Sequence, residues 1–172
     1  EQLLIEATAA NPQSWKAHHN LGTFVFARGR PDDAEESLRR AAALSNGKEA
    51  GPHIGLAQVY LDLDQPVRAL AESELACQLE GGGWAWFLRG RAHYELEQYD
   101  QAEEDFQRAV LLDPDLVLAH GEFAHIRALR GDLETARDSY RLVLLKDPGN
   151  AAARENPRRI ELERAAAHGG TP

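Results

Sequence analysis

The 172-residue sequence has no methionine, one cysteine and no long apolar run. The lone Cys77 excludes an intrachain disulfide framework and fits a reducing compartment, although a disulfide-free chain can also reside in a periplasm. No apolar stretch approaches the roughly 18 to 20 residues that span a bilayer, and no basic segment followed by an apolar one opens the chain. We therefore expect no membrane span, and a cytoplasmic location unless a targeting segment has been removed, in which case a periplasmic one.

Positive charge is also scarce. The chain carries 19 Lys and Arg residues against 28 Asp and Glu, for a net charge of -9. Nucleic-acid-binding proteins usually present a basic face, so we expect no nucleic-acid partner. Hydrophobic residues make up 43% of the chain, which is enough to build the core of one folded body. The absence of even an initiator methionine indicates an excised or processed segment.

A pattern of small and bulky residues recurs at intervals of about 34 residues. The small residues are Ala34, Ala69, Ala102 and Ala136. Four residues after each comes a mostly bulky one, namely Leu38, Ser73, Phe106 and Tyr140, and three residues further on come Ala41, Ala76, Ala109 and Val143. Helix-stopping residues then follow at Asn46, Gly81, Pro114 and Pro148. The spacing predicts a buried helix face in every unit.

A second helix precedes each of these. Twelve residues before each small residue lies another one, at Gly22, Ala57, Gly90 and Ala124, preceded four positions earlier by His18, His53, Trp86 and His120. The segments between the helices are rich in Gly, Pro and Asp, which suit helix ends. Small side chains let two helix axes approach to roughly 8 to 10 Å. We therefore expect helical hairpins, with Ala102 near Gly90 and Phe106 packed under the next hairpin.

These residues carry a family resemblance. The third unit reads WFLRGRAH, then AEEDF, then DP, and the first reads HHNLGTFV, then AEESL. They resemble the tetratricopeptide repeat signature W-x2-L-G-x2-Y, then A-x3-F, then Pro. The departures are His in three of the first aromatic positions, Arg89 in a leucine position and Ser73 in an aromatic one. The resemblance implies an all-α fold, a right-handed α-solenoid of stacked antiparallel helix pairs.

The repeats divide nearly the whole chain. The predicted units are residues 1–12 as the second helix of a preceding repeat, complete repeats at 13–46, 47–81, 82–114 and 115–148, a C-terminal capping helix at 149–167 and a disordered tail at 168–172. The Arg- and Glu-rich composition after residue 150 fits a polar cap over the last apolar face.

No set of residues indicates chemistry. The spacing of five between His120 and His125 is wrong for a metal pair on one helix face, and His18, His53 and His120 fill packing positions. Cys77 lies on a packed helix, and the glycines at 81–83 lack the residues of a phosphate loop, so they predict a flexible link between units. We expect no catalytic residues, metal or cofactor, and no enzyme activity.

A second stripe on the first helices, offset from the buried one, predicts a peptide-binding groove on the inner surface of the solenoid. Its residues are Lys16, His19, Thr23, Phe26, Ile54, Gln58, Leu61, Trp84, Phe87, Arg91, Tyr94, Leu118, Glu122 and His125. Trp84, Phe87 and Tyr94 beside Arg91 have the composition of a binding hot spot. The alternative interpretation is that Trp84 and Phe87 only cover the glycine-rich joint.

Some members of the family bind the acidic C-terminal tails of heat-shock chaperones through a clamp of Lys, Asn and Arg residues, and the sequence can be compared with this clamp. Lys16, Asn20 and Arg91 are present, but Gly55, Trp84 and Leu88 stand where further polar residues are wanted. A mixed apolar and cationic groove suits a segment with aliphatic anchors better.

The leading hypothesis is a non-catalytic scaffold that binds a protein or peptide partner. Two alternatives stay open: a recruitment or regulatory segment of a larger enzyme, such as a glycosyl- or sulfotransferase, and an assembly unit that self-associates through its N-terminal helix.

Overall fold

The computed structural model describes residues 1–156, which form helices and no strand. The helices are α1 (Gln2–Ala10), α2 (Trp15–Ala27), α3 (Pro31–Leu44), α4 (Ala50–Asp62), α5 (Pro66–Gln78), α6 (Gly82–Glu95), α7 (Tyr99–Leu112), α8 (Val117–Leu129) and α9 (Leu133–Lys146). Residues 151–156 are helical as well. The all-α prediction is confirmed. In the described part of the chain, no helix has the length and apolar character needed to cross a membrane.

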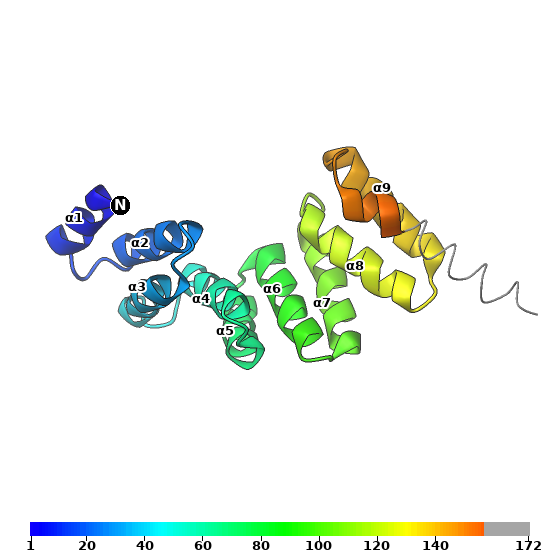
Figure 1. Cartoon of the computed structure of the whole chain (residues 1–172). Coiled ribbons are helices and arrows are strands. Elements are labelled where there is room, and N and C mark those ends of the chain that lie inside the picture. Colours follow the sequence, from blue (N-terminus) through cyan, green and yellow to red (C-terminus); the bar gives the residue numbers. More distant parts are fainter. Residues whose placement is uncertain (157–172) are drawn as a thin grey trace, which may run out of the picture.

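The helices stack as antiparallel pairs in chain order (Figure 1). Within the pairs, α2 packs on α3, α4 on α5, α6 on α7 and α8 on α9, and successive pairs meet through α3–α4, α5–α6 and α7–α8. The N-terminus and α9 therefore lie at opposite ends of the stack (Figure 1). This confirms the predicted solenoid of helix pairs, whereas its handedness and the unit boundaries stay predictions.

Polar residues and prolines set the helix ends. Ser14 Oγ accepts a hydrogen bond from the Ala17 N–H at 3.2 Å at the start of α2, and the Asp132 carboxylate accepts one from the Thr135 N–H at 3.2 Å at the start of α9. Pro31 opens α3, where its missing N–H costs no hydrogen bond. Each of these caps satisfies or removes a backbone donor that would otherwise have no partner, and thereby stabilises the start of its helix.

The repeated small residues lie at the helix contacts. A Cβ atom added to Gly22 would lie 2.6 Å from Leu38 Cγ, and one added to Gly55 would lie 2.8 Å from Leu38 Cδ2. Leu38 of α3 is thus held between α2 of its own pair and α4 of the next. Phe106 belongs to one apolar cluster with Phe87 and residues of α8, as expected for a side chain packed under the following pair.

The glycine-rich segment differs from the sequence-based expectation of a flexible link. Gly82 and Gly83 form the first turn of α6. Gly83 is buried, and a Cβ atom there would lie 2.8 Å from the Ala109 carbonyl oxygen and 2.7 Å from Asp113 Cβ. Gly82 has φ of +70°, a conformation that L-residues rarely adopt. Gly83 therefore allows α6 to approach the end of α7 closely and is a packing residue, whereas Gly82 supplies the positive φ at the start of the helix.

Ion pairs also cross the interfaces between pairs. Glu35 of α3 accepts hydrogen bonds from Tyr60 Oη at 3.1 Å and from Arg68 Nη2 at 2.5 Å. Burial opposes ionisation of this carboxyl, but the donors Arg68 and Tyr60 outweigh it and hold the pKa of Glu35 below its usual value. At a later interface, Arg127 Nε lies 2.8 Å from Glu103 Oε1. Polar contacts of this kind fix which helix faces meet.

The last described residues cover the end of the stack. Asn150 Oδ1 accepts a hydrogen bond from the Ala153 N–H at 3.0 Å, and Ala153 is buried in the cluster that contains Tyr140 and Val143. Residues 151–156 thus begin a helix that packs on the α8–α9 pair. The rest of the predicted capping helix, 157–167, and the predicted tail, 168–172, lie outside the described residues.

The contact at Gly90 gives a stability test. A Cβ atom on Gly90 would lie 2.7 Å from two Phe106 ring carbons, whereas one on Gly121 would meet no atom within 4 Å. We predict that Gly90→Ala lowers the free energy of unfolding by about 1 to 3 kcal/mol through overpacking. Gly121→Ala, the matched control within α8, should leave it unchanged or raise it by up to about 1 kcal/mol. Urea denaturation followed by circular dichroism measures both, and equal stability of the two variants would contradict the packing.

Candidate functional site: the face of the first helices

A cavity of about 280 Å³ opens on the face formed by α2, α4, α6 and α8. Of the residues predicted for the groove, it is lined by Phe26, Gln58, Leu61, Trp84, Phe87, Arg91, Leu118 and Glu122. They come from four helices that are distant in sequence and brought together by the stacking. The structure therefore gathers the middle of the predicted stripe around one hollow.

The aromatic residues of this cavity differ in exposure. Phe87 is only 3% exposed, and its ring centroid lies 6.0 Å from that of Phe106 in the core. Trp84 is half-buried, with its ring 5.1 Å from the Phe87 ring, and Leu118 is 55% exposed. Phe87 is thus a floor residue that belongs to the core. Trp84 and Leu118 present the accessible apolar surface.

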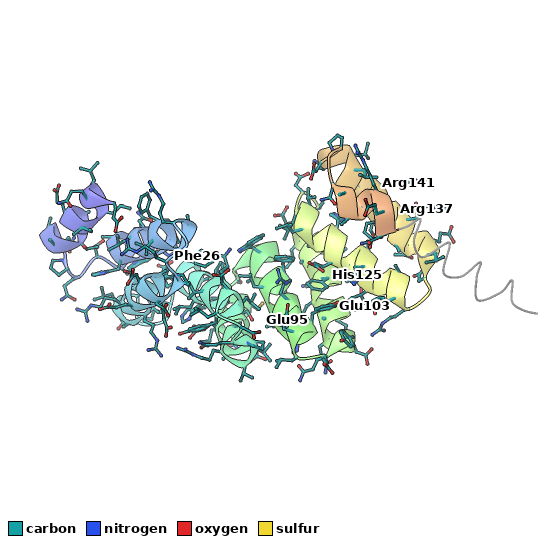
Figure 2. All side chains as sticks on the ribbon, in the orientation of Figure 1. Phe26, Glu95, Glu103, His125, Arg137 and Arg141 are labelled. Atoms are coloured by element: carbon teal, nitrogen blue, oxygen red, sulfur yellow. The ribbon has the colours of Figure 1, made fainter. Side chains whose placement is uncertain are left out.

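A second cavity, of about 220 Å³, adjoins the first. Leu118 and Glu122 line both, and His125 lines the second together with residues of α9 and of the segment after it. Tyr94 lines neither cavity but stands beside His125, with its Oη 3.5 Å from His125 Nε2. Figure 2 shows Phe26 and His125 in the two halves of the stack. The two hollows thus form one surface that continues from α2 to α9.

The remaining predicted residues lie on α2 and α4, outside the linings of these two cavities. The Lys16 ammonium lies 5.6 Å from the centroid of the Trp15 ring. Thr23 Oγ1 donates to the His19 and Asn20 carbonyl oxygens, each at 3.1 Å. Burial lowers the pKa of the His19 imidazole, which favours the neutral form of the ring. Ile54 packs against the apolar cluster of Phe87.

Two further residues line the first cavity, Asp62, which the sequence analysis missed, and Leu88, which it considered only as a position where the clamp would need a polar residue. Leu88 lies one helical turn after Trp84, and Asp62 directly follows Leu61 as the last residue of α4. Both fall beside the predicted stripe, because a groove between helices is lined by a wider arc of each helix than a single stripe covers. The signal in the sequence that could have identified them is their position next to residues already predicted for the groove.

The charges of this surface are unevenly paired. Arg91 Nη2 lies 3.7 Å from Glu95 Oε1 on the same helix, so the cation already has a partner. Within residues 1–156, no hydrogen bond or ion pair engages the carboxylate of Asp62 or of Glu122. The surface therefore combines apolar side chains with two free negative charges.

The histidines have structural partners. His18 Nε2 lies 3.2 Å from the Pro12 carbonyl oxygen, and His120 Nε2 lies 3.1 Å from the Pro114 carbonyl oxygen, at the same spacing in sequence. His53 Nδ1 lies 2.7 Å from Glu72 Oε2. In the described part of the chain, no three His, Cys, Asp or Glu side chains converge as metal ligands. A histidine in the aromatic position of the repeat thus ties the first helix to neighbouring residues.

The reactivity of the Cys77 thiol measures how well the packing of the second helix pair shields this side chain from solvent. Burial raises the pKa of the Cys77 thiol to about 11, so very little of it is thiolate at pH 8. We predict that the native protein reacts with dithionitrobenzoate at pH 8 roughly a hundredfold more slowly than the protein unfolded in guanidinium chloride, because an unfolded cysteine has a pKa of about 8.5. N-acetylcysteine in both solvents corrects for the denaturant, and equal corrected rates would show that the thiol is open.

Comparisons with known proteins agree with this architecture. Three models described as tetratricopeptide repeat match residues 1–49, 50–74 and 83–116. A search of curated proteins found no match.

Solved structures share the fold at low sequence identity. YrrB, titled a TPR protein with an unusual peptide-binding site, is 23% identical with a TM-score of 0.75, over 94% of this chain and 83% of that one. PilF of Pseudomonas aeruginosa is 18% identical with a TM-score of 0.79, over 98% and 82%. The second TPR domain of human RPAP3, solved with an HSP70 peptide, is 24% identical with a TM-score of 0.56, over 61% and 88%.

Proposed function

The chain belongs to the tetratricopeptide repeat family, and from this premise we propose that it is a non-catalytic interaction module that holds a segment of a partner protein on the face of α2, α4, α6 and α8. The observation that carries the proposal is the hollow of about 280 Å³ between these helices, open to solvent at Leu118 and Trp84. Exposed apolar side chains around a concave site are typical of recognition surfaces.

The contacts suggest distinct roles for the groove residues. Phe87 and Leu88 are buried and shape the floor, whereas Trp84 and Leu118 meet the ligand. Gln58, with a half-buried side-chain amide, supplies both a donor and an acceptor for a peptide backbone. The solved complex of the RPAP3 domain with an HSP70 peptide, and the peptide-binding site named for YrrB, support peptide binding as the mode.

The self-association alternative has one observation in its favour. Helix α1 buries none of its residues, and Leu3 and Ile5 are 80% and 43% exposed. Light scattering against concentration separates this function from the groove, since Leu3→Ser changes a dimer interface there and leaves the groove untouched. The recruitment segment of a larger enzyme stays the other alternative.

We predict that a displayed library of random dodecapeptides yields binders whose capture depends on Leu118. Leu118→Ala should weaken the selected peptides by about fivefold or more, which corresponds to the loss of about 1 kcal/mol that most interface residues do not reach. Trp84→Ala should act in the same direction. Phe87 is a poor choice for substitution, because its side chain belongs to the core.

Leu145→Ala is the matched control, since Leu145 is 77% exposed on α9 and lines neither cavity. Fluorescence anisotropy of labelled peptides measures the affinities, and circular dichroism confirms equal helicity of the variants. Peptides that bind both leucine variants as well as the unchanged protein would contradict the groove.

A further inference from the structure

The hollow carries a charge pattern that selects among peptides. Arg91, its one cation, lies 3.7 Å from Glu95, whereas Asp62 and Glu122 have no ionic or hydrogen-bonding partner within residues 1–156. The local sum is negative even with Arg91 included. A ligand that enters this surface meets two carboxylates whose charges are not compensated by the protein.

The positions of these carboxylates strengthen their effect. Asp62 is the last residue of α4, where the partial negative charge of the helix C-terminus adds to its own. Glu122 is half-buried and lines both cavities, so a bound segment lies beside it whichever hollow it occupies. A carboxylate that loses water to a ligand without gaining a donor is destabilised. Lysine or arginine on the ligand supplies that donor.

The apolar lining fits the same kind of ligand. Trp84 is half-buried, so part of its ring surface is open, and aromatic faces attract ammonium and guanidinium groups within about 6 Å. Leu118 lies one turn before Glu122 on α8, which places an apolar contact next to a negative one. An aliphatic side chain followed by a cation would engage both.

We propose that the partner segment is a basic one, with an aliphatic or aromatic anchor flanked by Lys or Arg, and that acidic segments are rejected. This proposal rests on the function proposed above and names the chemical class of its ligand. It also differs from the cationic character that the sequence indicates for the groove, because Lys16 lines neither cavity and Arg91 lies 3.7 Å from Glu95.

Three fluorescein-labelled pools of dodecapeptides test the proposal on the 172-residue chain. They share the same apolar positions and differ only in the polar ones, which hold Lys and Arg, Ser and Asn, or Asp and Glu. We expect the basic pool to bind about tenfold more tightly than the acidic pool, with the neutral pool between them. The difference should shrink as NaCl is raised from 50 to 500 mM, because salt screens exposed charges.

Variants locate the effect. Glu122→Gln and Asp62→Asn should each weaken the basic pool by about two- to fivefold and leave the neutral pool unchanged. Glu104→Gln is the matched control, since it removes the same charge from an exposed position of α7 that lines neither cavity. Equal weakening by all three variants would assign the preference to the net charge of the chain, and would overturn the proposal.

The outcomes distinguish a failure of the proposed charge preference from a failure of the proposed peptide-binding function. If the neutral or acidic pool binds as tightly as the basic one and Leu118→Ala weakens it, the charge preference is wrong and the groove stands. If no pool binds in a manner that depends on Leu118, both proposals fall.

Discussion

The structure depends on the close approach of helices at Gly and Ala. Every small residue of the repeat in α2 to α9 is buried, and at Gly22, Gly55 and Gly90 even one added carbon would meet a neighbouring side chain at under 3 Å. At this distance a bulky residue of the second helix, such as Leu38, packs against two helices at once. Because the second of these belongs to the next pair, no pair completes its core alone, and the chain has to extend as a stack.

Charged residues also join neighbouring helices, through ion pairs and hydrogen bonds beside the apolar contacts. Glu35 and Glu103 each directly follow the small residue of their helix, and each reaches a donor on the following pair, Tyr60 and Arg68 for the first and Arg127 for the second. Asp105, 2% exposed, is held by Arg89 Nε at 2.9 Å within its own pair. Removing water from such charges offsets much of their attraction, so we expect them to define the register of the helices more than they add to stability.

Many of the buried helix contacts could be predicted from the sequence, because the residues that make them recur in every repeat. Ala34, Gly90 and Phe106 were assigned to the core from spacing alone, since a buried contact that recurs leaves a period of about 34 residues. The glycines at 81–83 were misinterpreted because a glycine required for close approach looks the same in sequence as one in a flexible link. The neighbours of Gly83, namely Ala109 and Asp113, lie on α7 and at its C-terminal cap, and no local pattern reveals this contact.

The site was less accessible for a related reason. A stripe of residues can be read from helical spacing, but the pairing of charges across turns and helices cannot. Arg91 was treated as a free cation in the sequence analysis, although Glu95 stands four residues later on the same helix, a spacing that brings opposite charges together. Three other arginines, Arg68, Arg89 and Arg127, pair instead with carboxylates on neighbouring helices. In a chain with a net charge of -9, carboxylates outnumber cations, and the two that line the cavity, Asp62 and Glu122, have no ionic partner within residues 1–156.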